Sequence, residues 1–325
     1  MMKTDRDASA LIQIQMFGEF SISMEGSVLR ESDSHSRKAW LLLQYLIAFQ
    51  KREVSPSELI NVLWPDTELS NPSGSLKSLV FRARKLLAPL PVPASSLLIQ
   101  QNGIYKWNPA FQTETDFEEL DQIYHQLFTS VCREEERISL CQRGISLYQG
   151  EFLPNSSGES WVIPINTYYS SLYLKIAHYY MDLLMKDEKY DEIITLCRQV
   201  LTFEPYDETA HYYLTYSLYL DGNQPAAVSH YQAVIDSFYS HPGELPALTS
   251  RFTSLYKIIS SENHAHPADL DLILSQLSEN TPPQVLFRSL FLRICSVPGS
   301  VSGNYKKLCQ NWKLRLPLPV LHHCA

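Results

Sequence analysis

The chain has 325 residues, of which 45% are hydrophobic, and it carries 27 Lys+Arg against 35 Asp+Glu. This length predicts two or three domains, and the apolar fraction is high enough to give each domain a core. No apolar run reaches the ~18 residues of a membrane span, and residues 1–7 lack the apolar core of a signal peptide, which predicts a cytoplasmic protein with no membrane partner. The six cysteines form no CxxC pair and are expected to be reduced thiols.

Charge is distributed unevenly along the chain. Residues 1–110 hold 12 basic and 10 acidic side chains, and within them residues 71–110 hold five basic and no acidic ones. Residues 111–280 hold 9 basic and 25 acidic side chains, whereas residues 281–325 hold six basic and none acidic. The overall acidity argues against nucleic acid, but phosphate contacts need only a local basic patch. An acidic body would also keep non-specific DNA binding low.

The first elements are short strands and a helix. Residues 11–17 and 20–24 alternate between apolar and polar positions and are ended by Glu25-Gly26, which predicts a small antiparallel sheet. Residues 37–49 then have the periodicity of a helix. The inward face of this helix is expected to be Ala39, Leu42, Leu43, Leu46 and Ile47.

Two further helices are expected before the first proline-rich segment. Ser55-Pro-Ser-Glu58 is a capping box with Pro at the first helical position, so it opens a helix through Leu63 that Trp64-Pro65 ends. Asn71-Pro-Ser-Gly74 predicts a turn, and Ser75–Leu87 predicts a third helix.

The third helix is amphipathic and basic. A helical wheel gathers its apolar side chains into one stripe made of Leu76, Leu79, Val80, Ala83, Leu86 and Leu87. The other side carries Lys77, Ser78, Phe81, Arg82, Arg84 and Lys85. Such a helix can dock on a small core and still lie in a DNA groove. The alternative for a basic helix taken alone is a charged face that only meets solvent.

A proline-rich link and a predicted hairpin complete the first unit. Residues 97–107 contain two apolar segments around Gln-Asn-Gly, which is typical of a β-hairpin. A small sheet, three helices and a hairpin describe an α+β winged helix over residues 1–110, in which the third helix reads the major groove and the hairpin flanks it.

The rest of the chain is expected to be helical. Thr115-Asp-Phe-Glu118 is a second capping box, and residues 173–241 repeat with a period of 34. Each repeat breaks at its middle, at residues 187–189 and 221–223, and Pro205 closes the first. That length and break pattern predict tetratricopeptide-like helix pairs over residues 111–262. Most of the many tyrosines are expected to pack between helices, and some to line a concave groove.

An ordered set of landmarks resembles the SARP-type bacterial transcriptional activators, over roughly residues 10–260. The landmarks are Phe17-Gly-Glu-Phe20, Arg37-Lys-Ala39, Glu58-Leu59, Leu63-Trp-Pro-Asp66, Leu76 with Arg82-Ala-Arg-Lys-Leu-Leu87, Gly103-Ile-Tyr105, Thr115-Asp-Phe117, Tyr148-Gln-Gly-Glu-Phe-Leu-Pro154, Trp161 and Tyr190 with Pro205. The resemblance implies an OmpR-like winged helix joined to a bacterial transcriptional activation domain. It also implies a one-component regulator that binds double-stranded DNA near promoters as a homodimer or cooperative pair and touches RNA polymerase.

The resemblance places the recognition helix at 75–87 and the wing at 97–107. The helix entry, Pro72-Ser-Gly-Ser75, lacks the Arg and Asn often found in the family, so no operator sequence can be transferred. The wing tip, Gln101-Asn-Gly103, is polar but uncharged.

Individual roles follow from the face that each side chain occupies. Base-edge contact is expected from Ser78, Phe81 and Lys85, with Phe81 meeting a thymine methyl group or, alternatively, packing against the wing. Phosphate contact is expected from Lys77, Arg82, Arg84 and Lys106, together with Arg37 and Lys38.

Residues 263–325 predict a weakly ordered C-terminal extension. Its last part, 281–325, is proline-rich, without acidic residues and without sustained amphipathic periodicity, as in a truncated or altered C-terminus. The alternative is a basic extension that binds the acidic body.

No catalytic pattern is found, so an enzyme is not expected, and neither a cofactor nor a metal is predicted. The histidines at 264, 266, 322 and 323 lack partners at ligand spacing. The rival function is a protein-interaction scaffold of tetratricopeptide type, whose winged helix no longer binds DNA. The strongly acidic body and the shortened C-terminal end favour it.

Overall fold

The computed structural model describes residues 11–65, 67–101, 103–130, 133–240 and 247–260. The expectations for the C-terminal extension beyond residue 260, including its four histidines, lie outside the described residues.

The N-terminal sheet is larger than the sequence predicted. Its four strands, in the order β3-β2-β1-β6, are β1 (Ile12–Gln15), β2 (Ser21–Met24), β3 (Ser27–Arg30) and β6 (Thr113–Thr115). The first two were predicted, and β3 and β6 were missed. The tight turn at Glu25 and Gly26, both with positive φ, returns the chain directly into β3. Strand β6 has only three residues and pairs in parallel with β1, which is distant in the sequence. No local pattern of residues therefore predicts it.

Three helices pack beside this sheet: α1 (Arg37–Ala48), α2 (Pro56–Leu63) and α3 (Pro72–Leu86). Helix α1 is buried on nearly every side, because it contacts α2, α3 and the hairpin. Its Trp40 also packs edge-on against Phe20, which directly precedes β2. Helix α2 begins where its capping box predicted, with the Ser55 hydroxyl accepting a hydrogen bond from the Glu58 amide at 3.1 Å.

The predicted start of α3 was wrong by one turn. The helix begins at Pro72, because the Asn71 side chain accepts a hydrogen bond from the Gly74 amide at 2.9 Å and Pro72 occupies the first helical position. The segment 71–74, expected to be a separate turn, is therefore the cap and first turn of α3.

The hairpin was predicted correctly. It consists of β4 (Leu98–Gln101) and β5 (Ile104–Trp107), paired antiparallel, and the short helix α4 (Ala94–Leu97) precedes it within the proline-rich link. An isolated bridge between Val54 and Tyr105 attaches the hairpin to the helices. Sheet, three helices and hairpin form the expected α+β winged helix.

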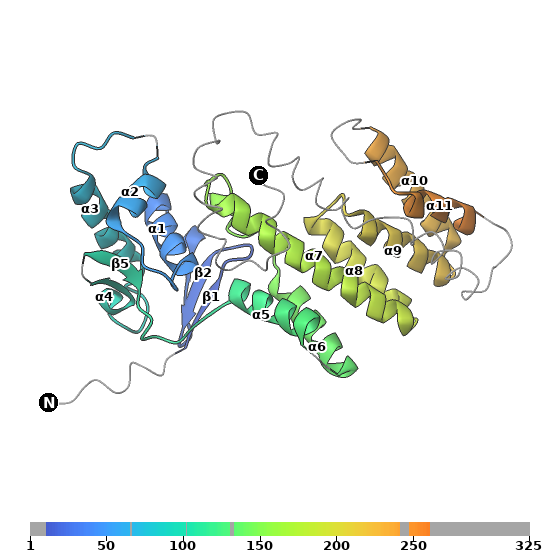
Figure 1. The fold of residues 1–325 in the computed structure, drawn as a ribbon, viewed down its shortest axis with the longest axis horizontal. Coiled ribbons are helices and arrows are strands. Elements are labelled where there is room, and N and C mark those ends of the chain that lie inside the picture. The colour runs from blue at the N-terminus through green and yellow to red at the C-terminus, as the bar shows by residue number, and fades with distance from the viewer. Residues whose placement is uncertain (1–10, 66, 102, 131–132, 241–246, 261–325) are drawn as a thin grey trace.

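The remaining part is all-α, and its helices lie in succession beside the winged helix (Figure 1). They are α5 (Asp116–Thr129), α6 (Glu134–Leu147), α7 (Val162–Lys186), α8 (Tyr190–Phe203), α9 (Glu208–Leu220), α10 (Gln224–Tyr239) and α11 (Ser250–Ile259). Both predicted breaks, 187–189 and 221–223, are the turns inside the pairs α7–α8 and α9–α10, which confirms the helical repeat. No helix in the described part of the chain is long and apolar enough to cross a bilayer.

The tyrosines of this domain are mainly packing groups, as expected. Of nine tyrosines on α7 and α9, seven are buried and two, Tyr168 and Tyr179, are half-buried. Tyr180 also lines an open hollow of about 600 Å³ between α6, α7 and α8, where Gln142 donates a hydrogen bond to its hydroxyl at 3.0 Å. The buried seven are Tyr169, Tyr173, Tyr180, Tyr212, Tyr213, Tyr216 and Tyr219.

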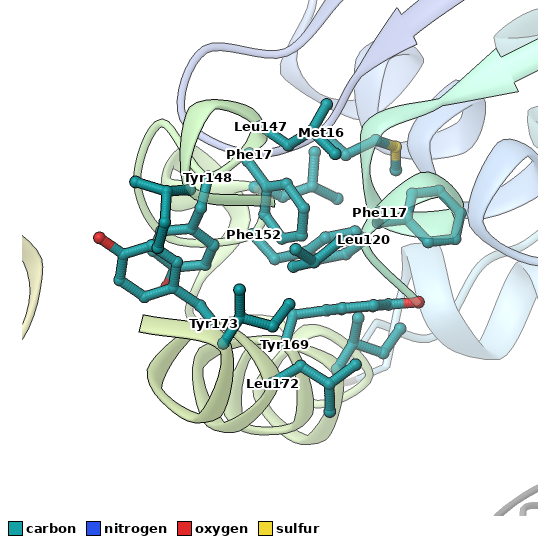
Figure 2. Packing of buried hydrophobic residues seen from close by; sticks show 14 of the residues in the cluster. Met16, Phe17, Phe117, Leu120, Leu147, Tyr148, Phe152, Tyr169, Leu172 and Tyr173 are labelled. Carbon is teal, nitrogen blue, oxygen red and sulfur yellow. The ribbon is translucent and has the colours of Figure 1, made fainter. Parts of the chain in front are cut away.

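A packed junction joins the winged helix to the helical domain. The Asp116 carboxylate accepts hydrogen bonds from the backbone amides of Met16 and Phe17 at 2.8–2.9 Å, just past the end of β1. Beside it, aromatic rings from both domains pack together, and Figure 2 shows Phe17 among side chains of the helical domain. The rings are Phe17, Phe117, Tyr148, Phe152, Tyr169 and Tyr173.

Candidate nucleic-acid interface

Helix α3 has two chemically different faces, as its sequence predicted. The side chains of Leu76, Leu79, Val80 and Ala83 are buried, and the helix packs through them against α1 and α2. The opposite face is exposed and is called here the α3 stripe. The α3 stripe consists of Lys77, Ser78, Phe81, Arg82 and Lys85.

The cations of the α3 stripe are free of acidic partners. Among the residues that the structure describes, no carboxylate lies within ion-pair distance of Lys77, Arg82 or Lys85. Lys85 also lies in the last turn of the helix, where positive charge opposes the helix dipole favourably. The three charges are therefore available to an anionic surface.

Phe81 projects outward from the middle of the stripe. Its side chain is 71% exposed, which makes the alternative that it packs against the hairpin wrong. Lys77 and Lys85 lie one turn before and one turn after it on the same face. An apolar ring thus stands between two cations on the exposed face of α3.

Arg84 has a structural partner that the sequence did not reveal. Its guanidinium donates two hydrogen bonds, from Nε at 3.0 Å and Nη2 at 2.8 Å, to the carbonyl oxygen of Leu98 at the start of β4. The half-buried side chain therefore ties α3 to the hairpin and fixes their relative placement.

Lys106 lies on the hairpin rather than on α3. It is half-buried on β5, opposite Ile99 of β4. Gly103 in the connecting turn has a φ of 81°, a conformation that favours glycine and allows the tight return of the strand.

Family and structure comparisons agree with this architecture. The family model of the bacterial transcriptional activator domain matches residues 115–240. Residues 115–240 are a bacterial transcriptional activator domain. A solved structure, Mycobacterium tuberculosis EmbR in complex with a low-affinity phosphopeptide, is 16% identical, with a TM-score of 0.59, over 85% of this chain and 73% of that chain. At this identity the likeness supports the fold. No curated protein matches the chain.

The activator domain begins where α5 begins, and the winged helix lies before it. A winged helix followed by this domain is the order of parts that the resemblance found in the sequence implied.

The two outer site candidates lie at the start of α1. Arg37 is exposed and forms an ion pair with Glu159 of the activator domain at 3.6 Å. Lys38 places its ammonium 4.9 Å from the centre of the Trp64 ring, a cation–π contact. The two neighbours in sequence therefore face different parts of the molecule.

A shallow hollow adjoins the α3 stripe near Trp64. It measures about 480 Å³, and two predicted site residues, Ser78 and Arg82, contribute to its lining. The other lining residues are Trp64, Asn71, Gly74 and Ser75. The structure thus brings Lys77, Ser78, Phe81, Arg82, Lys85 and Lys38 to one side of the winged helix. No local pattern of residues indicates this hollow, because Trp64 and α3 come together only in the folded chain.

Proposed function

We propose that this chain is a one-component transcriptional regulator that binds promoter DNA through α3 and the hairpin. The observation that carries the proposal is the α3 stripe, whose cations have no acidic partner among the described residues. A solvated charged face of an acidic protein would be expected to carry compensating carboxylates nearby, whereas residues 71–110 contain none. Cations presented without counter-charges suit a polyanion.

Roles within the stripe follow from position. Ser78, Phe81 and Lys85 are assigned to base edges, and Lys77 and Arg82 to phosphates, with Lys106 reaching the backbone from the hairpin. Arg84 is assigned mainly to holding the hairpin, because two of its donor groups are already used. Lys38 and Arg37 are peripheral phosphate candidates, and the Glu159 pair makes Arg37 the weaker one.

The helical part, residues 111–262, is proposed to mediate self-association or contact with RNA polymerase, after a DNA-binding part at 1–110. Its strong net negative charge would repel phosphates, so DNA is expected to lie on the α3 side of the molecule. A pair of copies on neighbouring half-sites is the assembly that the family resemblance favours. Action on chromosomal DNA places the protein in the cytoplasm.

The test is selection of bound genomic fragments followed by measurement of affinity at about 50 and 200 mM salt. Sequence-selective binding that weakens steeply with salt is expected, with each phosphate contact contributing about −0.9 to the slope of log K against log salt. A Lys77→Ala/Arg82→Ala double variant should have a slope shallower by about two. A Lys186→Ala/Lys189→Ala variant removes two charges from the helical domain and is the matched control.

A scaffold without DNA binding is the competing outcome. Absence of any binding at about 50 mM salt would support the scaffold and contradict the regulator. Binding of equal strength to all fragments would contradict sequence-specific control.

A further inference from the structure

Phe81 combines an exposed aromatic ring with a central place in a cationic surface. Single exposed apolar side chains are common on proteins and need no partner in general. Phe81 differs because its 71% exposed ring lies on α3 directly between Lys77 and Lys85, on the face that points away from the core. Any polyanion that both lysines reach must also meet this ring.

The dimensions of the stripe match those of a DNA groove. Lys85 follows Lys77 by eight positions, which corresponds to about 12 Å along a helix axis. The major groove is about 12 Å wide and admits an α-helix. With the two ammonium groups directed at the groove walls or base edges, the ring in the middle faces the groove floor.

The chemistry of the ring limits what it can recognise there. A phenyl ring offers no donor or acceptor to a base edge, so it cannot take part in the hydrogen-bond code of the groove. The one apolar group exposed on the major-groove floor is the C5-methyl group of thymine. Wedging between base steps, the other use of apolar side chains on DNA, belongs to minor-groove binders.

We propose that Phe81 is a specificity-determining residue that reads the C5-methyl group of a pyrimidine near the centre of each half-site. The inference rests on the proposed function, since it needs α3 to enter the major groove. The ligand class is duplex DNA with thymine at that position. A 5-methylcytosine presents the same methyl group from a G·C pair and is recognised in its place.

The experiment uses the full chain and the tightest fragment obtained by genomic selection. Each thymine is replaced in turn by deoxyuridine, which removes one methyl group and leaves all hydrogen bonds of the base pair intact. One thymine per half-site is expected to show about a fourfold loss of affinity, the fold-change that corresponds to ~0.8 kcal/mol for one buried methyl-sized group. In Phe81→Ala the same replacement should have no effect.

Two further measurements separate a methyl contact from a general effect of the ring. Changing the critical T·A pair to C·G should weaken binding, and methylating that cytosine should recover about fourfold in the wild type but not in Phe81→Ala. Phe81→Leu, which keeps an apolar tip, should retain part of the deoxyuridine sensitivity. Tyr239→Ala is the matched control, because Tyr239 is also 71% exposed but lies on α10, and it should leave binding unchanged.

The outcomes distinguish this inference from the proposed function. Sequence-selective, salt-dependent binding with no sensitive thymine would overturn the role of Phe81 and leave the regulator intact. Equal deoxyuridine losses in wild type and Phe81→Ala would overturn it as well. Failure to select any preferred fragment would overturn both.

Discussion

Lys85 is the side chain of the α3 stripe for which base contact and phosphate contact can be separated most simply. It is exposed in the last turn of α3, and no acidic group among the described residues forms an ion pair with it. If it contacts a guanine edge, Lys85→Ala should cost about 1–3 kcal/mol on the selected site and much less on scrambled DNA. Dissociation constants on both probes measure this. Equal losses on both would assign Lys85 to phosphate.

Lys106 should behave differently, because it lies on the hairpin and not on α3. Its replacement by Ala is expected to weaken binding to all sequences alike and to make the salt slope shallower by about one. Titrations of selected and scrambled DNA at several salt concentrations measure the slope. An unchanged slope would show that Lys106 makes no phosphate contact.

Arg84 is expected to act on stability as well as on binding. Arg84→Ala removes the two hydrogen bonds to the Leu98 carbonyl and should lower the free energy of unfolding by about 1–3 kcal/mol. Because the hairpin then loses its two side-chain hydrogen bonds to α3 and is placed less firmly, affinity should fall on all DNA while the salt slope stays nearly constant. Arg82→Ala is the control: it should leave stability unchanged and make the slope shallower. A shallower slope with unchanged stability in Arg84→Ala would restore the phosphate role.

The sequence predicted the two faces of α3 well because helical periodicity alone decides them. It assigned Arg84 to the polar side, although this residue falls only about 40° from the edge of the apolar stripe on a wheel of 100° per residue. At such a border position the tertiary partner decides the role. The Leu98 carbonyl lies 14 residues further along the chain, and no local rule connects the two.

At the scale of elements, the 34-residue repeat makes a prediction about backbone strain. Glu188 and Gly222 occupy equivalent positions after α7 and α9, with φ values of 56° and 83°. In each case the next residue closes the helix end, through hydrogen bonds from Lys189 to Leu184 and from Asn223 to Leu218 at 3.0 and 2.9 Å. The left-handed conformation costs a residue with a Cβ about 1–2 kcal/mol, and glycine avoids this cost.

Glu188→Gly is therefore expected to stabilise the protein by about 0.5–1 kcal/mol, since the greater flexibility of unfolded glycine offsets part of the gain. Chemical denaturation measures the change. Gly222→Ala is the reverse variant and should destabilise by a similar amount, as nothing lies close enough to its added methyl group to clash. Destabilisation by Glu188→Gly would mean that the side chain outweighs the backbone strain.

The contact between α9 and α10 predicts a pH dependence. His211 Nδ1 and His230 Nε2 lie 3.1 Å apart. The pKa of His230 is lowered from its ordinary 6.5 to about 4, mainly because the imidazole is buried and also because His211 and Arg198 lie nearby. The unfolded chain thus takes up a proton between pH 6.5 and 4 that the folded chain does not. Folding stability must therefore fall as the pH falls through this range.

Because His230 is only half-buried, the effect is expected to be about 1 kcal/mol between neutral pH and pH 5. Denaturation curves at the two pH values measure it, and His230→Gln, which keeps an acceptor for the pair, should show a smaller difference. An identical pH dependence in the variant would exclude His230 as its source.

Predictability at the element scale depended on element length and repetition. The helix pairs were found because their period recurs and both breaks carry turn-forming residues. Strands β3 and β6 were missed because three or four residues give too little alternation to recognise. The predicted start of α3 is one turn too late, because Asn71-Pro-Ser-Gly74 also has the composition of a turn. The same cap-and-proline pattern at Ser55-Pro56 correctly predicts the start of α2.

At the scale of the whole molecule, the junction between the two domains was invisible in the sequence. Asp116 and Met16 are 100 residues apart in the sequence. The capping box at 115–118 predicts only that a helix begins there. In the structure the Asp116 carboxylate accepts hydrogen bonds from backbone amides at the end of β1. The Leu153 backbone amide donates a hydrogen bond to the Met16 carbonyl at 2.8 Å. Parallel pairing of β6 with β1 adds a third connection. The winged helix is thus fixed to the activator domain by backbone contacts as well as by ring packing.

Asp116→Ala is expected to loosen this junction. The change leaves the amides of Met16 and Phe17 without their acceptor, and each buried unsatisfied amide costs about 1–3 kcal/mol, so the free energy of unfolding should fall by at least about 2 kcal/mol. Hydrogen exchange of these two amides should accelerate more than that of β2, because the loss is local to the junction. Asp121→Ala is the matched control on the same helix.

The Asp121 carboxylate accepts a hydrogen bond from the Tyr168 hydroxyl at 2.6 Å, a contact within the activator domain. Loss of this hydrogen bond in Asp121→Ala should lower the free energy of unfolding without changing the hydrogen exchange of the Met16 and Phe17 amides. If the two variants gave the same exchange pattern, Asp116 would contribute only to its own helix. Accelerated exchange confined to Asp116→Ala would instead identify this carboxylate as the polar connection that holds the winged helix in a fixed position relative to the activator domain.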